Sequence, residues 1–168
     1  MNTIIYTYFN SPCGDIIVGS IDDELCLCDW TNRKNRGTID RRMRRILKAD
    51  MQQGTSAVIE FAIKQLDEYF SGKRKFFDIP IRFAGTDFQQ RVWKELCCIP
   101  YGQTASYGEI AARIGMPTSV RAVANANGAN AIAILVPCHR VIGSNKTLTG
   151  YAGGLATKQF LLDLETKH

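Results

Sequence analysis

The chain has 168 residues, of which 45% are hydrophobic and 22% are charged, and its formal net charge is +5. This composition is typical of a globular protein, and the length allows one good core or two small ones. No apolar run approaches the ~18 residues needed to span a bilayer, and the first residues lack the basic and apolar regions of a signal peptide. We therefore expect neither a membrane span nor secretion.

Most of the net positive charge lies in the second half of the chain. Residues 1–80 hold 12 Lys and Arg against 11 Asp and Glu, whereas residues 81–168 hold 9 against 5. A basic half is compatible with a polyanionic partner such as DNA. A solvated basic surface would give the same count, so the charge alone does not choose between the two.

The cysteines favour reduced thiols in a cytoplasmic protein. The chain is not a small secreted one, so a disulfide framework is not expected. Cys97 and Cys98 fall in a helical pattern, and we expect one to be a core residue and the other its neighbour. The Cys-x-Cys spacing in the first half is not that of a zinc or redox site, and the two histidines lie far from it in sequence. We predict no bound metal. The six cysteines are Cys13, Cys26, Cys28, Cys97, Cys98 and Cys138.

Alternating apolar residues predict strands in the first 30 residues. The run 4–9 alternates, a turn signal follows at 10–15, and the apolar runs 16–18 and 25–30 come next. This pattern indicates an antiparallel meander. The basic run 33–48 reads as a solvated helix or loop.

One helix and one extended segment complete the first half. Thr55 and Ser56 can cap a helix that continues to about Phe70 with an apolar stripe at helical spacing. Residues 77–83 alternate but contain Pro80, which indicates an edge strand or an extended linker. We place a domain boundary at about residue 83, giving domains 1–83 and 84–168.

The second half reads as helices with clear start signals. Residues 86–89 (TDFQ) form a capping box that opens a helix, and Pro100 stops it. Residues 106–109 (SYGE) form another capping box, opening a helix through Ile114. The turn 115–118 then leads into a helix to about Asn127. Helix, tight Gly-containing turn and helix is the helix-turn-helix pattern. The small residues of its second helix allow close approach to a DNA groove or to a neighbouring helix.

A buried strand is predicted directly before Cys138 and His139, the candidate nucleophile and base. The apolar run 132–136 leads into Cys138 and His139, residues 143–146 predict a hairpin turn, and a last helix follows Gly154. A thiol needs a base or a positive charge to become a nucleophile, and His139 can supply the base. A histidine in turn needs an acceptor on its other nitrogen. The acidic candidates in this half are Asp87, Glu95, Glu109, Asp163 and Glu165. An inert buried thiol beside a structural histidine remains the alternative.

An ordered set of motifs makes this half resemble the O6-alkylguanine-DNA alkyltransferases, the methylated-DNA–protein-cysteine methyltransferases. The resemblance covers nearly all of residues 86–165, whereas residues 1–83 resemble the family's small α/β domain only loosely. The motifs are FQQRVW (88–93), IPYG (99–102), SYGE (106–109), RAV (121–123), Asn130, PCHRV (137–141) and YAGGL (151–155).

The resemblance implies an α/β (α+β) fold, in which a small ribonuclease-H-like domain precedes a mostly helical winged helix-turn-helix domain. It implies direct-reversal repair, in which an alkyl group moves irreversibly from O6-alkylguanine in double-stranded DNA to Cys138; O4-alkylthymine is a further candidate substrate. His139 and a water would take the thiol proton, and Glu165 would hold His139. Tyr107 would stabilise the leaving guanine, and Asn130 would brace the site.

The family resemblance also implies how DNA is bound. The second helix of the helix-turn-helix would enter the minor groove, and the damaged base would be flipped out of the stack. Arg121 would fill the vacated place, next to Ala122, Ala124 and Ala126. Tyr107, Val141, Tyr151 and Ala152 would contact the flipped base. The resemblance implies a monomer without cofactors.

Two departures and two alternative functions accompany this interpretation. Ala131 and Ala133 stand where the family often has proline, and Ala152 stands where serine is common.

A Cys-His hydrolase would share the dyad, but it needs an oxyanion hole and has no need of a helix-turn-helix. A lesion-binding alkyltransferase-like protein would lack the acceptor thiol, and Cys138 argues against that class.

Overall fold

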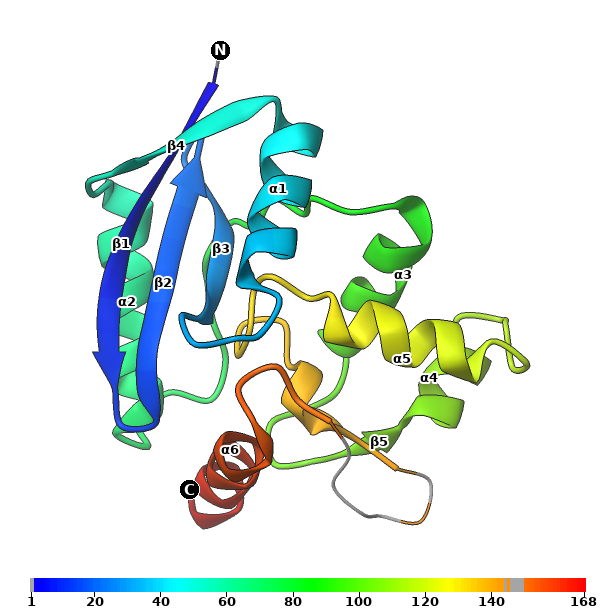
Figure 1. Cartoon of the computed structure of the whole chain (residues 1–168). Coiled ribbons are helices and arrows are strands. Elements are labelled where there is room, and N and C mark those ends of the chain that lie inside the picture. The colour runs from blue at the N-terminus through cyan, green and yellow to red at the C-terminus, as the bar shows by residue number, and fades with distance from the viewer. Residues whose placement is uncertain (1, 144, 146–149) are drawn as a thin grey trace. The chain divides into compact units, whose positions relative to one another are not determined.

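The computed structural model describes residues 2–143, 145 and 150–168, which form two compact units, Met1–Gly85 and Thr86–His168. Each unit has its own buried core, and the chain passes from one to the other directly before the Thr86 capping box (Figure 1). Within the described residues no helix combines the length and apolar character needed to cross a membrane.

The first unit is a four-stranded sheet with two helices (Figure 1). Strands β1 (Asn2–Ser11), β2 (Gly14–Ile21) and β3 (Glu24–Trp30) form the antiparallel meander expected from their alternation. Helix α1 (Arg36–Leu47) then leads into β4 (Ala49–Gln53), which pairs in parallel with β1, so the strand order is β3-β2-β1-β4. No periodicity in the sequence indicated β4.

Helix α2 (Ala57–Phe70) packs on this sheet, and its start agrees with the prediction. Ser56 caps it by accepting a hydrogen bond from the amide of Ile59. Residues 77–83 are extended, and Ile81 forms a single bridge to Leu25 of β3. The segment is therefore an extended linker with one bridge to the sheet.

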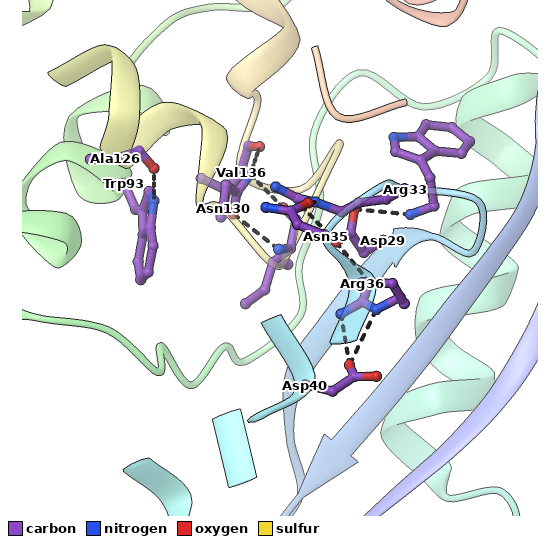
Figure 2. A network of polar contacts seen from close by, with 11 residues as sticks. Asp29, Arg33, Asn35, Arg36, Asp40, Trp93, Ala126, Asn130 and Val136 are labelled. Carbon is purple, nitrogen blue, oxygen red and sulfur yellow. Dashed lines mark hydrogen bonds and ion pairs between the residues drawn. The ribbon is translucent and has the colours of Figure 1, made fainter. Parts of the chain in front are cut away.

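A buried ionic cluster lies where β3 leads into α1. Asp29 is completely buried and accepts hydrogen bonds from the guanidinium groups of Arg33, at 2.7 Å, and Arg36, at 2.8 Å (Figure 2). A buried carboxylate is tolerated only when paired in this way. Arg33 and Arg36, in the basic run 33–48, are thus structural. The prediction of a solvated segment holds for the exposed residues of α1.

The second unit is mostly helical. Helices α3 (Asp87–Leu96), α4 (Tyr107–Arg113) and α5 (Val120–Gly128) pack against one another. Both predicted capping boxes are present, at Thr86 with Gln89 and at Ser106 with Glu109. Helix α5 begins at Val120, shortly after the predicted turn 115–118, and Ser119 makes no side-chain cap.

Three short elements and one helix complete this unit. Strands β5 (Ala105–Ser106) and β6 (Val141–Ile142) pair in parallel, η1 (Cys138–Arg140) is a single 3-10 turn, and α6 (Leu155–Lys167) is the last helix. Both α3 and α6 contact η1. The hairpin turn predicted at 143–146 falls partly outside the described residues.

Two local predictions for this unit were wrong. The buried run 132–136 is not a strand but a tight bend with one isolated bridge, because Ile134 has a φ of +71° and Asn130 binds both ends of the run. A short apolar run can be buried in several backbone conformations. Cys97 and Cys98 lie just after α3 and are both exposed, so neither is a core residue.

Candidate active site

Cys138 begins the η1 turn and is 4% exposed. The bend before it is organised by Asn130, whose side-chain nitrogen donates to the carbonyl of Val136 at 2.9 Å and whose oxygen accepts from the amide of Ile132 at 2.9 Å (Figure 2). Asn130 is buried, so these bonds replace those that water would make. Asn130 therefore holds the bend before Cys138, and the bracing role that the family resemblance implies for it stays a prediction.

His139 and Glu165 meet in the interior of the second unit. His139 is completely buried, and its Nε2 lies 2.7 Å from Oε2 of Glu165 on α6. Glu165 is thus the acidic partner, selected from the five acidic candidates. Burial lowers the pKa of His139, and the positive charges of Arg140 and Lys158 lower it further against the opposing effect of Glu165. Burial is the largest of these effects, so the net shift favours the neutral imidazole.

Glu165 is held ionised by a second partner, Arg140. The guanidinium binds both carboxylate oxygens, Nε to Oε1 at 2.8 Å and Nη2 to Oε2 at 3.0 Å, and its Nη1 donates to the carbonyl of Ile99 at 2.7 Å. Burial by itself would raise the pKa of Glu165, but the hydrogen bonds and charges of His139 and Arg140 hold it at about 2. The carboxylate is thus a fixed negative charge behind His139.

A buried lysine completes the charged groups around η1. Lys158 on α6 is completely buried, and its ammonium donates to the carbonyl of Val141 at 2.5 Å. Burial lowers its pKa, while the negative form of Cys138 acts on it in the opposite direction. Lys158 and a thiolate at Cys138 therefore stabilise each other. Of the two buried cations, Arg140 is paired with Glu165 and Lys158 binds a backbone carbonyl.

No role was predicted from the sequence for the side chain of Arg140 or of Lys158. Arg140 stands inside the quoted PCHRV motif, but nothing local shows that its side chain turns toward Glu165. Lys158 had a usable signal, because it lies on the same face of α6 as the buried Leu161 and Glu165. A lysine on an apolar helix face is rarely buried without a partner.

The predicted base-contacting residues surround β6 and the start of α6. The parallel pairing of Ala105 with Val141 and of Ser106 with Ile142 brings the first residue of α4, Tyr107, to the end of β6. Tyr107 is half-buried. Tyr151 and Ala152 are also half-buried and stand in the turn before α6, where the amide of Gly154 donates to the carbonyl of Tyr151.

The predicted DNA-contacting residues divide along α5. Arg121 and Ala122 are exposed, and Ala124 is half-buried. Ala126 is 3% exposed, and its carbonyl accepts the indole hydrogen of Trp93 at 2.8 Å (Figure 2). Its placement on a DNA-facing surface was therefore wrong, because α5 packs on α3 at that point. The described residues contain no group of three His, Cys, Asp or Glu arranged to hold a metal ion.

An α/β unit followed by a helix-turn-helix unit that buries a Cys-His-Glu arrangement defines a class of protein that joins DNA binding to thiol chemistry. Residues 4–83 match the family described as 6-O-methylguanine DNA methyltransferase, ribonuclease-like domain, and residues 87–167 match its DNA binding domain. The chain belongs to the 6-O-methylguanine DNA methyltransferase family, and its fold is the family's fold.

Relatives and solved structures agree with this membership. A methylated-DNA–protein-cysteine methyltransferase of Methanosarcina barkeri is 47% identical over 160 residues, which cover 95% of this chain and 96% of the relative. The crystal structure of the Mycobacterium tuberculosis O6-methylguanine methyltransferase matches with a TM-score of 0.83 at 42% identity, covering 98% of this chain and 93% of that one. The same mycobacterial protein in complex with DNA matches with a TM-score of 0.82 at 41% identity, with the same coverage.

Proposed function

We propose that this chain repairs O6-alkylguanine in double-stranded DNA by transferring the alkyl group to Cys138 in a single turnover. The transfer of a methyl group from DNA to a protein cysteine is the activity that family membership carries. The observation that supports Cys138 as the acceptor is the buried pair of Glu165 and His139, the residue that follows Cys138. Cys138 is the acceptor, because it adjoins this neutral histidine and Lys158 favours its negative form.

The transfer is an in-line displacement in which the thiol loses a proton and gains a carbon. The proton passes from Cys138, through a water, to Nδ1 of His139, since Nε2 is engaged with Glu165. The sulfur lone pair forms the bond to the alkyl carbon, the bond from that carbon to guanine O6 breaks, and its electrons remain on the guanine. Tyr107 stabilises the leaving guanine by donating a hydrogen bond.

The resulting carbon–sulfur bond is that of a thioether, which is stable in water. The reaction therefore ends with an alkylated, inactive protein and an unmodified guanine. No cofactor takes part. O4-alkylthymine presents a similar exocyclic oxygen and is a second candidate substrate.

We further propose that α5 enters the minor groove and that the lesion is flipped out of the duplex. The target carbon is inaccessible in a stacked helix, so flipping is required and costs a few kcal/mol. Arg121 is exposed near the start of α5 and is long enough to occupy the vacated position. Ala122 is exposed beside it and allows close approach to the groove. The protein acts as a monomer in the cytoplasm.

Mass spectrometry after exposure to a duplex with one O6-methylguanine tests this function. We expect the protein mass to rise by one methyl group, located by peptide mapping on Cys138, and the yield to stop at one equivalent. Cys97 and Cys98 are internal controls, because both are exposed thiols outside the site. Multiple turnovers would indicate a hydrolase, binding without an adduct would indicate a lesion-binding protein, and equal labelling of Cys97 or Cys98 would contradict the assignment of Cys138.

A further inference from the structure

A buried asparagine connects α5 to the reactive cysteine. Asn127 is the next-to-last residue of α5 and is 5% exposed, and its Nδ2 donates to the backbone carbonyl of Cys138 at 3.5 Å. That contact fixes the orientation of the amide, since the reverse orientation would place two oxygens against each other. The Oδ1 atom must therefore face another way.

Two buried polar atoms around Cys138 lack a protein partner. Among the residues that the structure describes, Oδ1 of Asn127 and Nδ1 of His139 are both buried and accept no hydrogen bond. A polar atom buried without a partner costs about 1–3 kcal/mol, and an ordered water with two to four partners is the usual means of satisfying such atoms. Asn127 contacts the carbonyl of Cys138 through the nitrogen of the same amide, and His139 is the residue that follows Cys138 in the chain.

Both of these atoms can only accept hydrogen bonds. A neutral His139 whose Nε2 hydrogen points to Glu165 presents a lone pair at Nδ1. An amide oxygen also presents only lone pairs. One water has two hydrogens, so it can donate to both atoms while its oxygen accepts the hydrogen of a thiol.

We propose that Asn127 is a positioning residue for alkyl transfer, whose amide oxygen holds the water that carries the proton from Cys138 to His139. This inference rests on the proposed function and adds a residue to it. The proton leaves the sulfur for the water as another proton of that water moves to Nδ1, so the water is restored. Asn127 fixes the water through Oδ1 and the thiol-bearing backbone through Nδ2.

The pH dependence of this step involves the charged groups packed around η1. They are Lys158 and Glu165 from α6 and Arg140 and His139 from η1 itself. The segment after α3 contributes the titratable Cys97 and Tyr101, which interact with Arg140, together with the neutral carbonyl of Ile99. Helix α5 contributes the neutral Asn127. Replacing Asn127 by another neutral residue therefore leaves every charge in place.

The test compares Asn127→Leu with Asn32→Leu across pH. Asn32 is exposed in the first unit, so the control makes the same chemical change away from α5 and η1. Single-turnover rates are measured at saturating duplex with one O6-methylguanine, which removes any effect on DNA affinity. We expect Asn127→Leu to react at least tenfold more slowly near neutral pH and to recover toward the parent rate at high pH, where bulk base removes the thiol proton. Asn32→Leu should match the parent throughout.

Other outcomes would overturn the inference. A loss of rate by the same factor at every pH would mean that Asn127 only supports the backbone, and an unchanged rate would mean that it has no role. A high-resolution crystal structure of the parent protein gives an answer that needs no folded variant: a solvent peak bonded to both Oδ1 of Asn127 and Nδ1 of His139 supports the inference, and a protein donor on Oδ1 refutes it. If the parent takes up no methyl group, the proposed function itself fails, which is a separate result.

Discussion

Arg140 binds the carboxylate of Glu165 through two of its nitrogens while the same carboxylate binds Nε2 of His139. The negative charge of Glu165 is thus balanced by Arg140, and His139 remains neutral until it accepts a proton. When that proton arrives, Glu165 stabilises the imidazolium. A fully buried arrangement of this kind is expensive to break, because one unpaired charge would remain in the interior.

The buried pair should make the protein sensitive to acid in two steps. The pKa of Glu165 is about 2 in the native state and about 4.3 in an unfolded chain, so its contribution is complete above about pH 4.3 and is lost as the pH falls toward 2. The pKa of His139 is lowered by burial, so the unfolded state gains a proton first and stability begins to fall below about pH 6.5. Denaturant unfolding between pH 7 and pH 3 measures both steps.

The loss of stability that comes from protonation of Glu165 should disappear in Glu165→Gln. A pKa difference of about two units corresponds to about 3 kcal/mol of unfolding free energy. The variant should therefore be less stable than the parent at pH 5 but should lose less stability between pH 5 and pH 3. Equal slopes for the two proteins in that range would show that the acid sensitivity comes from other carboxyl groups.

Glu165→Gln should also slow alkyl transfer, because a neutral partner stabilises imidazolium less than a carboxylate does. We expect a rate loss of about tenfold or more, each factor of ten being ~1.4 kcal/mol, and a pH–rate profile moved to higher pH. Asp163→Asn is the matched control, since Asp163 is exposed on the same helix. An unmoved pH–rate profile in Glu165→Gln would contradict the role of His139 as the base.

Lys158→Met should remove a buried positive charge while keeping the volume and apolar stem of the side chain. The charge favours the negative form of Cys138, so the variant should react at least tenfold more slowly at pH 7, with a smaller deficit at higher pH. Lys167→Met, an exposed change on α6, should have no effect. Parent-like rates in Lys158→Met with a parent-like melting temperature would leave Lys158 as only a support for Val141.

Arg121→Ala should separate base flipping from chemistry. The variant should react with a free alkylated guanine base as fast as the parent does, because no group around Cys138 is altered. Its repair of the lesion in saturating duplex should fall sharply, since the flipped state loses a few kcal/mol of support. Arg113→Ala serves as the control for loss of one exposed charge.

The opposite pattern would give Arg121 a simpler role. If Arg121 only contacts a phosphate, affinity falls, the salt dependence weakens by about one ion, and saturating DNA restores the rate. Single-turnover rates at rising DNA concentration distinguish the two cases.

The sequence by itself determined the features that depend on neighbours along the chain. The capping boxes at Thr86 and Ser106 form as predicted, because each joins residues only three positions apart. The meander of β1–β3 follows from two-residue alternation with short turns. The motif around Cys138, together with the motifs spaced along residues 86–165, was sufficient to indicate the family.

The tertiary structure alone decided which distant groups meet. The bend at 132–136 replaces the expected strand because Asn130 binds both ends of the run, and parallel pairing of β4 with β1 depends on the crossover through α1. Arg140, Lys158 and Asn127 carried no local sign of their partners, since their contacts lie between 11 and 41 positions away. Burial makes those contacts obligatory, because a charge or amide removed from water must find a partner wherever the fold brings one.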